Sequence, residues 1–296
     1  MKKVLCLLSL AFLWASGQTA ASAQERFEVR TAEEFIQAIG SNRVLVLSEE
    51  AYLLTPLFLE SAYFIEMTDR SKNVFYVPET DGPEIHIKGV RNLTIEAEDG
   101  LVSVLTEPRY ANVLSFEDCT NLTIKGVTFG HTDEGTCSQG VLGFYDCENV
   151  VLEHVDLFGC GTEGIIAENC RKMQFKGTKV RDCSYYIMHL SACDDVKFTD
   201  CQFFRNREYD LVTVNDCMNV QFNNCIFANN TGVLFQVQSP IELRDCVILH
   251  DNRLLGTEAS LSKISVINCV FEFFFHPMQF NLGHLSGTDE LYFSPQ

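Results

Sequence analysis

One short phrase returns along most of the chain at a nearly constant interval, and it limits the fold more than any other feature. Its copies read CTNLTIKGVTF, CENVVLEHVDL, CRKMQFKGTKV, CDDVKFTDCQF, CMNVQFNNCIF, SPIELRDCVI and SKISVINCVF, and they begin at Cys119, Cys147, Cys170, Cys193, Cys217, Ser239 and Ser262. Successive copies therefore start 28, 23, 23, 24, 22 and 23 residues apart. Such a period is typical of a solenoid, in which each repeat packs on its neighbours.

Each phrase predicts two short strands separated by a sharp bend. Apolar residues alternate in the first strand, as in Leu122 and Ile124, which indicates a strand with one buried face. The bend falls on residues that are mostly Gly, Asn or Asp, the types that best tolerate a left-handed backbone. These positions are Gly126, His154, Gly177, Asp200, Asn224, Asp245 and Asn268.

A third strand precedes each phrase, and its register is predicted by counting back from the start of the phrase. One column reads Leu114, Leu142, Ile165, Met188, Val212 and Leu234, and a second reads Phe116, Phe144, Ala167, Leu190, Val214 and Gln236. Both are almost wholly apolar, so we expect them to face inward. Three strands make one coil of about 23 residues, and stacked coils would enclose a continuous core.

This pattern resembles the right-handed parallel β-helix of the pectate lyase type, over roughly Glu84 to Phe275. The resemblance implies an all-β fold with three parallel sheets. It implies no single activity, because the superfamily contains lyases, hydrolases, epimerases and adhesins.

The ends of the chain differ from the repeats. Residues 1–23 have two lysines, an apolar run and an A-x-A site, which predicts a bacterial signal peptide and a periplasmic or secreted protein without membrane insertion. The rest, 24–296, is predicted to be one domain. It comprises a cap with irregular first coils (24–82), regular coils (83–275) and a C-terminal cap or tail (276–296).

The predicted N-terminal cap contains a short helix. Thr31 and Glu34 form a capping box, and we expect this helix to cover the open end of the first coil. The stretch from Arg43 to Leu47 is predicted to be the first strand. At the other end, Phe273, Phe274, Phe275 and Phe280 are expected to pack over the last coil.

Charge restricts the partners. The formal net charge is −18, and removing Lys2 and Lys3 with the signal peptide makes it about −20. An acidic chain lacks the lysines and arginines that bind phosphates, which excludes nucleic acid and anionic membranes as expected partners. A polyanionic polysaccharide is also disfavoured unless calcium assists.

The cysteines are predicted to form stacked columns of free thiols. Cys119, Cys147, Cys170, Cys193 and Cys217 share one turn position, and Cys201, Cys225, Cys246 and Cys269 share a core position. Free cysteine is a small apolar residue that is usually buried. Neighbouring coils would nevertheless lie close enough for some of these pairs to form disulfides.

Three cysteines in the variable loops leave three alternatives open. Cys160 and Cys183 lie at the same offset in successive coils, and the preceding loop supplies Cys137 and His131. Cys160 pairs with Cys183 or Cys137 in the disulfide hypothesis, and the thiols stay free in the second. Zinc bound by three cysteines and His131 is the third, but the short-spacing pairs of zinc motifs are absent, so no metal is predicted.

The outward face of the third strand is the predicted binding groove, as the resemblance implies. It presents Glu117, Tyr145, Glu168, His189 and Asn215, with Ile166 and Phe235 as apolar patches, and its walls are His131, Asp133, Glu134, Glu163, Tyr185, Arg205, Arg207 and Glu208. Glu168 and His189 lie on neighbouring coils. A carboxylate and an imidazole so placed are the candidate acid and base.

The sequence favours binding over catalysis. The R-x-P-x-x-R stretch of pectate lyases, the N-x-D, D-D and R-x-K set of polygalacturonases and the D-P-H-D stretch of mannuronan epimerases are all missing. We therefore predict a non-catalytic exported protein that binds or scaffolds a polysaccharide or cell-envelope glycan, without a cofactor. The alternatives are a polysaccharide lyase or glycoside hydrolase using Glu168 and His189, with calcium if it is a lyase, and a purely structural protein.

Overall fold

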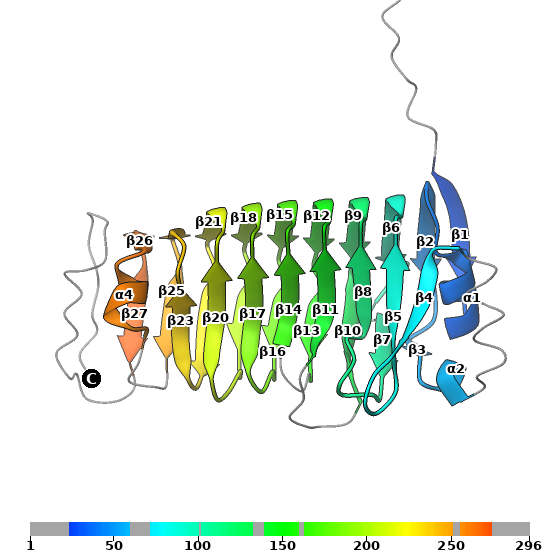
Figure 1. The fold of residues 1–296 in the computed structure, drawn as a ribbon, viewed down its shortest axis with the longest axis horizontal. Coiled ribbons are helices and arrows are strands. Elements are labelled where there is room, and N and C mark those ends of the chain that lie inside the picture. The colour runs from blue at the N-terminus through cyan, green and yellow to red at the C-terminus, as the bar shows by residue number, and fades with distance from the viewer. Residues whose placement is uncertain are drawn as a thin grey trace, which may run out of the picture.

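The structure is a computed structural model that describes residues 24–59, 72–100, 102–132, 139–159, 163–250 and 255–273. Its strands form three long sheets whose coils follow one another along the long axis of the molecule (Figure 1). Among the described strands, neighbours run parallel except for β4 and β5. The predicted right-handed parallel β-helix is confirmed.

Each coil contributes one strand to each sheet. Sheet A contains, in spatial order, β1 (Glu25–Val29), β2 (Arg43–Leu47), β6 (Arg91–Ala97), β9 (Thr120–Lys125), β12 (Glu148–Glu153), β15 (Arg171–Lys176), β18 (Asp194–Thr199), β21 (Met218–Asn223), β24 (Ile241–Arg244) and β26 (Ile264–Ile267). Its central strands are the first strands predicted from the repeated phrase.

The other two sheets complete the coil. Sheet B contains β3 (Ala51–Leu53), β7 (Val102–Thr106), β10 (Val127–His131), β13 (Asp156–Phe158), β16 (Lys179–Arg181), β19 (Gln202–Phe204), β22 (Ile226–Asn230), β25 (Val247–His250) and β27 (Val270–Phe273). Sheet C contains β4 (Val74–Pro78), β5 (Pro83–Lys88), β8 (Leu114–Glu117), β11 (Gly140–Tyr145), β14 (Glu163–Glu168), β17 (Tyr186–Ser191), β20 (Asp210–Asn215) and β23 (Val233–Val237).

The bends between sheets A and B lie where the sequence predicts them. All of the predicted bend residues have positive φ, with values from 51° at Asn224 to 66° at Gly126. Further left-handed residues were not predicted. In the coil of β15, for example, Asn169 precedes the strand with φ 54° and Lys172 lies within it with φ 56°.

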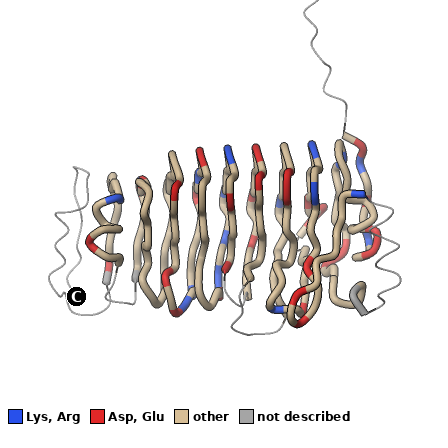
Figure 2. The backbone as a smooth tube through the Cα atoms, viewed as in Figure 1, with Lys and Arg blue, Asp and Glu red and all other residues tan. Residues whose placement is uncertain are grey.

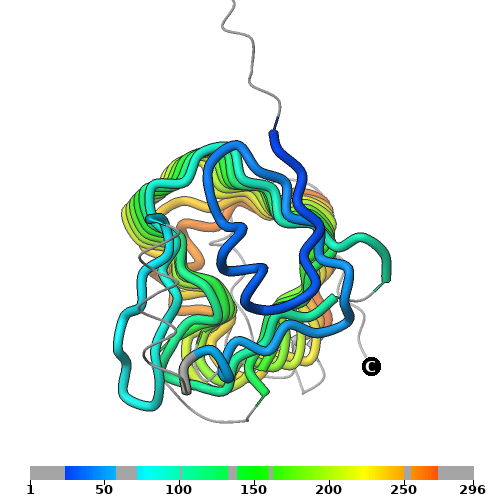
Figure 3. Tube along the Cα trace, turned by 90° about the vertical axis from the view of Figure 1, so that its right-hand side faces the viewer, coloured from blue at the N-terminus to red at the C-terminus, as the bar shows by residue number. Residues whose placement is uncertain are grey.

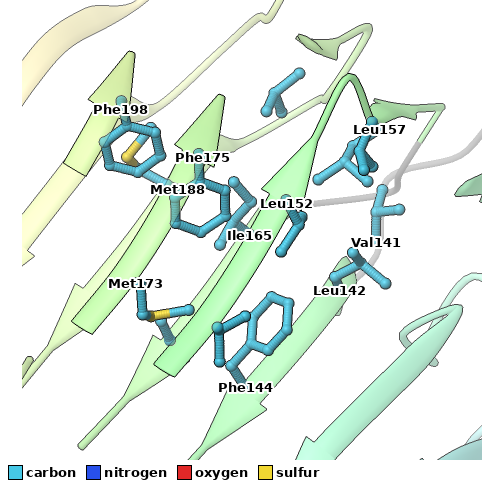
Figure 4. Packing of buried hydrophobic residues seen from close by; sticks show 14 of the residues in the cluster. Val141, Leu142, Phe144, Leu152, Leu157, Ile165, Met173, Phe175, Met188 and Phe198 are labelled. Carbon is cyan, nitrogen blue, oxygen red and sulfur yellow. The ribbon is translucent and has the colours of Figure 1, made fainter. Parts of the chain in front are cut away.

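The core consists of like side chains stacked on like. Phe175, Phe198 and Phe222 stack in sequence, with ring centroids 4.5 and 4.7 Å apart. Side chains of sheet C such as Phe144 and Ile165 point toward those of sheet A in the interior (Figure 4). This repeated burial is the main source of stability in a stacked fold.

The described cysteines are buried and free, as predicted for thiol ladders. In the turn column, for example, the Cys147 thiol donates to the carbonyls of Phe116, at 3.4 Å, and Tyr145, at 3.3 Å. The ladder thus supplies donors to carbonyl groups at the turn between sheets C and A.

The N-terminal end differs in part from the prediction. Helix α1 (Ala32–Ala38) begins after Thr31, whose hydroxyl accepts from the Glu34 amide at 3.1 Å, and it lies across the open end of the solenoid (Figure 3). Arg43–Leu47 is not the first strand, because β1 precedes it and pairs with it. Strand β4 pairs antiparallel with β5 rather than forming a further coil.

The predicted register of β23, the last strand of sheet C, is wrong by one residue. Phe235, not Leu234, pairs with Val212, and Phe235 is 0% exposed rather than an outward patch. Ser239 occupies the place of the turn cysteine, since its hydroxyl accepts from the Cys217 amide at 2.9 Å. Only Gln238 separates Val237 from Ser239, so this turn is one residue shorter than its predecessor.

Charged side chains of both signs are interspersed along the coils (Figure 2). On the outer face of sheet A, Glu153 lies between Lys125 and Lys176, at 3.3 and 3.5 Å. Exposed pairs of this kind contribute little to stability. The described helices, which include α2 (Pro56–Leu59) and α4 (Glu258–Leu261), are too short and not apolar enough to cross a membrane.

Candidate functional site

The outer face of sheet C carries three columns of side chains. The first contains Gly140, Glu163, Tyr186, Asp210 and Val233; the second contains His86, Ser115, Gly143, Ile166, His189, Thr213 and Gln236; the third contains Lys88, Glu117, Tyr145, Glu168, Ser191 and Asn215. The residues between these columns belong to the buried core. Strand alternation therefore directs the second and third columns outward, and two consecutive inward residues separate the first column from the second.

A buried carboxylate lies at the N-terminal end of this face. Glu84 accepts hydrogen bonds from the Asn112 backbone amide at 2.8 Å, the Asn112 side-chain amide at 3.1 Å and the Ser115 hydroxyl, and His86 Nε2 lies 2.8 Å away. Burial opposes ionisation of Glu84, but these hydrogen bonds outweigh it and lower its pKa. Glu84 is thus held as a carboxylate. No pattern in the sequence marks it as a site residue.

The third column begins with an ion pair. Lys88 Nζ lies 2.6 Å from Glu117 Oε2, and His86 Nδ1 lies 3.8 Å from the same oxygen. The structure thus places Glu117 on the outer face, as predicted, and partly neutralises its charge.

Tyr145 lies over a gap left by a glycine. A Cβ added at Gly143 would lie 2.9 Å from Tyr145 Cε2 and 2.6 Å from Ser115 Oγ, so only glycine accommodates the ring there. Burial, followed by the charge of Glu84, raises the pKa of Tyr145 to about 12. The phenol is therefore a neutral hydrogen-bonding group.

Glu163 occupies the most unusual environment on the face. Its side chain is 13% exposed, and its Oε2 is buried without a hydrogen-bond partner in the described part of the chain. Burial, and then the negative charge of Glu168, raise the pKa of Glu163 to about 7. The sequence placed Glu163 on a loop wall, whereas it is the first residue of β14.

The predicted pair Glu168 and His189 lies on the same face but in different columns. Glu168 pairs with Ser191, and His189 pairs with Ile166, which is 7% exposed rather than an open patch. The carboxylate nearest His189 is that of Glu163, whose Oε2 lies 4.0 Å from His189 Nδ1. Glu168 itself is exposed.

The remaining predicted site residues lie apart from Glu168 and His189. Asn215 is in the third column, as predicted. Arg205 follows the end of β19, with its guanidinium over the Phe204 ring and its Nε 2.7 Å from Asp182. Arg207 is exposed in the same loop.

The predicted histidine of the long loop is not a wall residue. His131 is 3% exposed, and its Nε2 lies 2.9 Å from the carbonyl of Ala111. Burial lowers its pKa, so it is a neutral core residue. Asp133, Glu134, Cys137 and Cys160 lie outside the described residues. Cys183 is a buried free thiol.

Two stacked tyrosines border the first column. The rings of Tyr185 and Tyr209 are parallel within 2°, with centroids 4.5 Å apart, and Tyr209 is 57% exposed. In the sequence, Tyr185 directly precedes Tyr186 and Tyr209 directly precedes Asp210, and both of these following residues belong to the first column. They therefore add an exposed aromatic surface to a face that is otherwise polar.

Comparisons with known proteins identify the architecture. A family profile described as right handed beta helix region matches residues 112–271. A pectate lyase from Paenibacillus sp. 0602 is similar over 92% of this chain and 84% of its own, with 10% identity and a TM-score of 0.59. At this identity the likeness shows the fold alone.

Two further solved structures are also similar. The match to pectate lyase Pel9A covers 93% of this chain and 79% of the lyase chain, with 10% identity and a TM-score of 0.47. The match to the surface protein and adhesin PfbA of Streptococcus pneumoniae covers 92% of this chain and 90% of PfbA, with 11% identity and a TM-score of 0.35. A search of curated proteins finds no match.

Proposed function

Because the chain belongs to the family of right-handed β-helix proteins, we propose that it is an exported protein that binds a neutral polysaccharide or cell-envelope glycan on the outer face of sheet C. The observation that carries the proposal is the stack of half-buried Tyr185 and exposed Tyr209 beside a polar sheet face. Sugar rings have apolar C–H faces and polar rims, and binding sites that combine aromatic surface with a few fixed polar groups suit them.

The polar groups of the face support this proposal. Thr213 Oγ1, Asn215 Oδ1 and Glu163 Oε2 have no hydrogen-bond partner among the described residues. Unsatisfied polar groups are uncommon in folded proteins and suggest a partner that is not present. These three atoms are buried in the free protein, so a glycan hydroxyl can donate to them only when their side chains turn outward on binding.

The charge of the face favours a neutral glycan. Its carboxylates are Glu84, Glu117, Glu163, Glu168 and Asp210, and the lysine in its columns is Lys88. An anionic glycan would be repelled by this surface. In the described part of the chain no group of three or more His, Cys, Asp or Glu side chains is arranged to hold a metal ion, so the proposal gives calcium no part in binding.

The test is affinity measurement against a panel of neutral polysaccharides, with polygalacturonate and alginate as anionic comparators, each with and without calcium. We expect a neutral glycan to bind, and Tyr209→Ala to weaken binding about tenfold, because an exposed aromatic ring contributes about 1 kcal/mol or more. Met218→Ala, which removes an exposed apolar side chain from sheet A, is the matched control and should bind like the wild type.

Two results would contradict the proposal. One is that no neutral glycan binds the folded protein. The other is that Tyr209→Ala and Met218→Ala have equal affinity, which would place the contact away from sheet C.

A further inference from the structure

Strand β1 ends sheet A at the N-terminal end of the solenoid, and one of its edges has no partner strand in the described part of the chain (Figure 1). On the other edge, the Glu25 amide donates to the Asn42 carbonyl at 2.8 Å, so the backbone groups of Glu25 point toward β2. Because successive residues of a strand point these groups to opposite edges, those of Arg26 and Glu28 point to the open edge. An open edge can bind a further strand.

The stretch that can accept a strand is short and defined. The next amide in the series, that of Arg30, donates to Glu34 Oε2 at 2.8 Å. A partner strand would therefore bond to the backbone of Arg26 and Glu28. Strand β3, which ends sheet B at the same end of the solenoid, has only three residues and offers less backbone for pairing.

The sequence of β1 is complementary to itself in the antiparallel direction. When Phe27 lies opposite Phe27 of a second copy, Arg26 lies opposite the second copy's Glu28, and Glu28 lies opposite its Arg26. These side chains remain accessible, because 62% of Arg26 and 54% of Glu28 are exposed even though each already contacts a charged neighbour. Opposite charges directly across two strands stabilise the pair, and like charges destabilise it.

The position of Phe27 favours the same register. A hollow between β1 and α1 is lined by Phe27, Glu28, Val29, Glu34, Gln37, Ala38 and Arg43. The guanidinium of Arg43 lies over the Phe27 ring, 4.9 Å from its centroid. Directly opposed residues of an antiparallel pair share one face of the sheet, so the second copy's Phe27 would enter the hollow.

The cap helices add a second match of charge. A two-fold axis at Phe27 makes the two copies of α1 antiparallel, which turns the acidic first turn of one helix toward the end of the other. The first turn contains Glu33 and Glu34, and at the end Arg43 Nη1 donates to the Ala38 carbonyl at 2.8 Å. The net charge of −18 opposes association of two copies, so the local matches favour only a weak dimer.

We propose that two copies of the chain associate head to head, by antiparallel pairing of their β1 strands about a two-fold axis at Phe27. Arg26 and Glu28 then exchange backbone hydrogen bonds with Glu28 and Arg26 of the second copy. Sheet A continues from one solenoid into the other. The dimer carries two outer faces of sheet C, but the pairing itself does not depend on glycan binding.

The experiment is sedimentation velocity of the purified protein. We expect a monomer–dimer equilibrium between about 1 and 100 μM. Arg26→Glu places like charges across both symmetry-related pairs, and Glu28→Arg does so with the opposite sign, so each should weaken dimerisation at least about tenfold. Arg244→Glu is the matched control, because it reverses an arginine of the same sheet that lies 3.1 Å from Glu242, and it should dimerise like the wild type.

Two further measurements separate pairing from a folding defect. In a mixture of Arg26→Glu and Glu28→Arg, the carboxylates of one copy face the guanidinium groups of the other, so the mixture should dimerise although neither variant does so alone. Glu28→Pro removes a backbone N–H that points away from β2. It should abolish the dimer while β1 stays paired with β2.

Three results would overturn the proposal. One is a wild-type protein that stays monomeric over the whole concentration range. Another is a dimer that persists in both Arg26→Glu and Glu28→Pro, because association would then use another face. The third is a mixture of the two charge variants that associates no more tightly than each variant alone, which would exclude the register centred on Phe27.

Discussion

At the scale of single residues, the site depends on how two identical side chains are surrounded. Glu84 and Glu163 both lie on the outer face of sheet C and are mostly buried. Four groups contact the carboxylate of Glu84, and hydrogen bonds keep its pKa low, whereas Glu163 Oε2 has no hydrogen-bond partner and its pKa is raised to about 7. Hydrogen bonding therefore decides which carboxylate is ionised.

The raised pKa of Glu163 predicts a pH-dependent stability that needs no substrate to measure. Its protonated form is favoured in the folded state, so the stabilisation is fully present below the ordinary value of 4.5 and is lost as the pH rises through about 7. Relative to Glu163→Gln, the wild type should lose about 2–3 kcal/mol of unfolding free energy across this range. Urea unfolding at pH 4.5 and pH 8 measures the difference.

The same pair of measurements on Glu242→Gln provides the control, because this side chain lies on the half-exposed face of sheet A. Its difference from the wild type should change little with pH. If Glu163→Gln and the wild type lose stability in parallel between pH 4.5 and 8, the carboxyl is not protonated in the folded state.

Sequence alternation predicted which residues face outward, including Glu117, Tyr145 and Glu168. It did not predict Glu84 or the environment of Glu163. Their properties depend on contacts with residues of other coils and turns, such as Asn112, and a strand pattern contains no information about those contacts. Likewise His131 looked like a loop residue, although it ends β10 and is buried.

At the scale of the coil, Glu163 faces outward because the next two residues of β14 both point inward. A Cβ at Gly164 would lie 2.2 Å from Val180 Cγ1 and 2.7 Å from the carbonyl oxygen of Ile187, so position 164 points into the core. Ile165, the next residue, is buried as well. The glycine lets the corner between sheets B and C close tightly enough to place Glu163 outside.

We therefore predict that Gly164→Ala destabilises the protein by about 2–3 kcal/mol, because the added methyl group meets a side chain and a backbone carbonyl that cannot both move. Gly89→Ala is the matched control. Nothing lies within 4 Å of a Cβ at Gly89, and its φ of 66° costs an alanine about 1 kcal/mol. Equal losses of unfolding free energy in urea would contradict this account of the corner.

The strands and bends of a coil were predictable where the repeat is regular. Their prediction failed where the length of the repeat changes. The bends at Gly177 and its equivalents follow from residue type and spacing. Phe235 was placed outward because the count assumed a turn of constant length, and the turn before Ser239 is one residue shorter. Strand β1 was missed because it precedes the first recognisable phrase.

At the scale of the whole molecule, stacking converts a weak local pattern into a long, uniform surface. The columns of sheet C continue from coil to coil, so the face extends along the axis of the solenoid (Figure 1). Such a surface suits a linear polymer, because successive sugar rings can meet successive coils. The family explains the shape, whereas the residues of this chain decide what the shape binds.

The most direct test of this account is a crystal structure of the protein with an oligosaccharide of the bound glycan. The account predicts a chain of sugar rings along the outer face of sheet C, with one ring packed on Tyr209. Sugar bound on sheet A or sheet B, with the outer face of sheet C empty at saturating ligand, would contradict it.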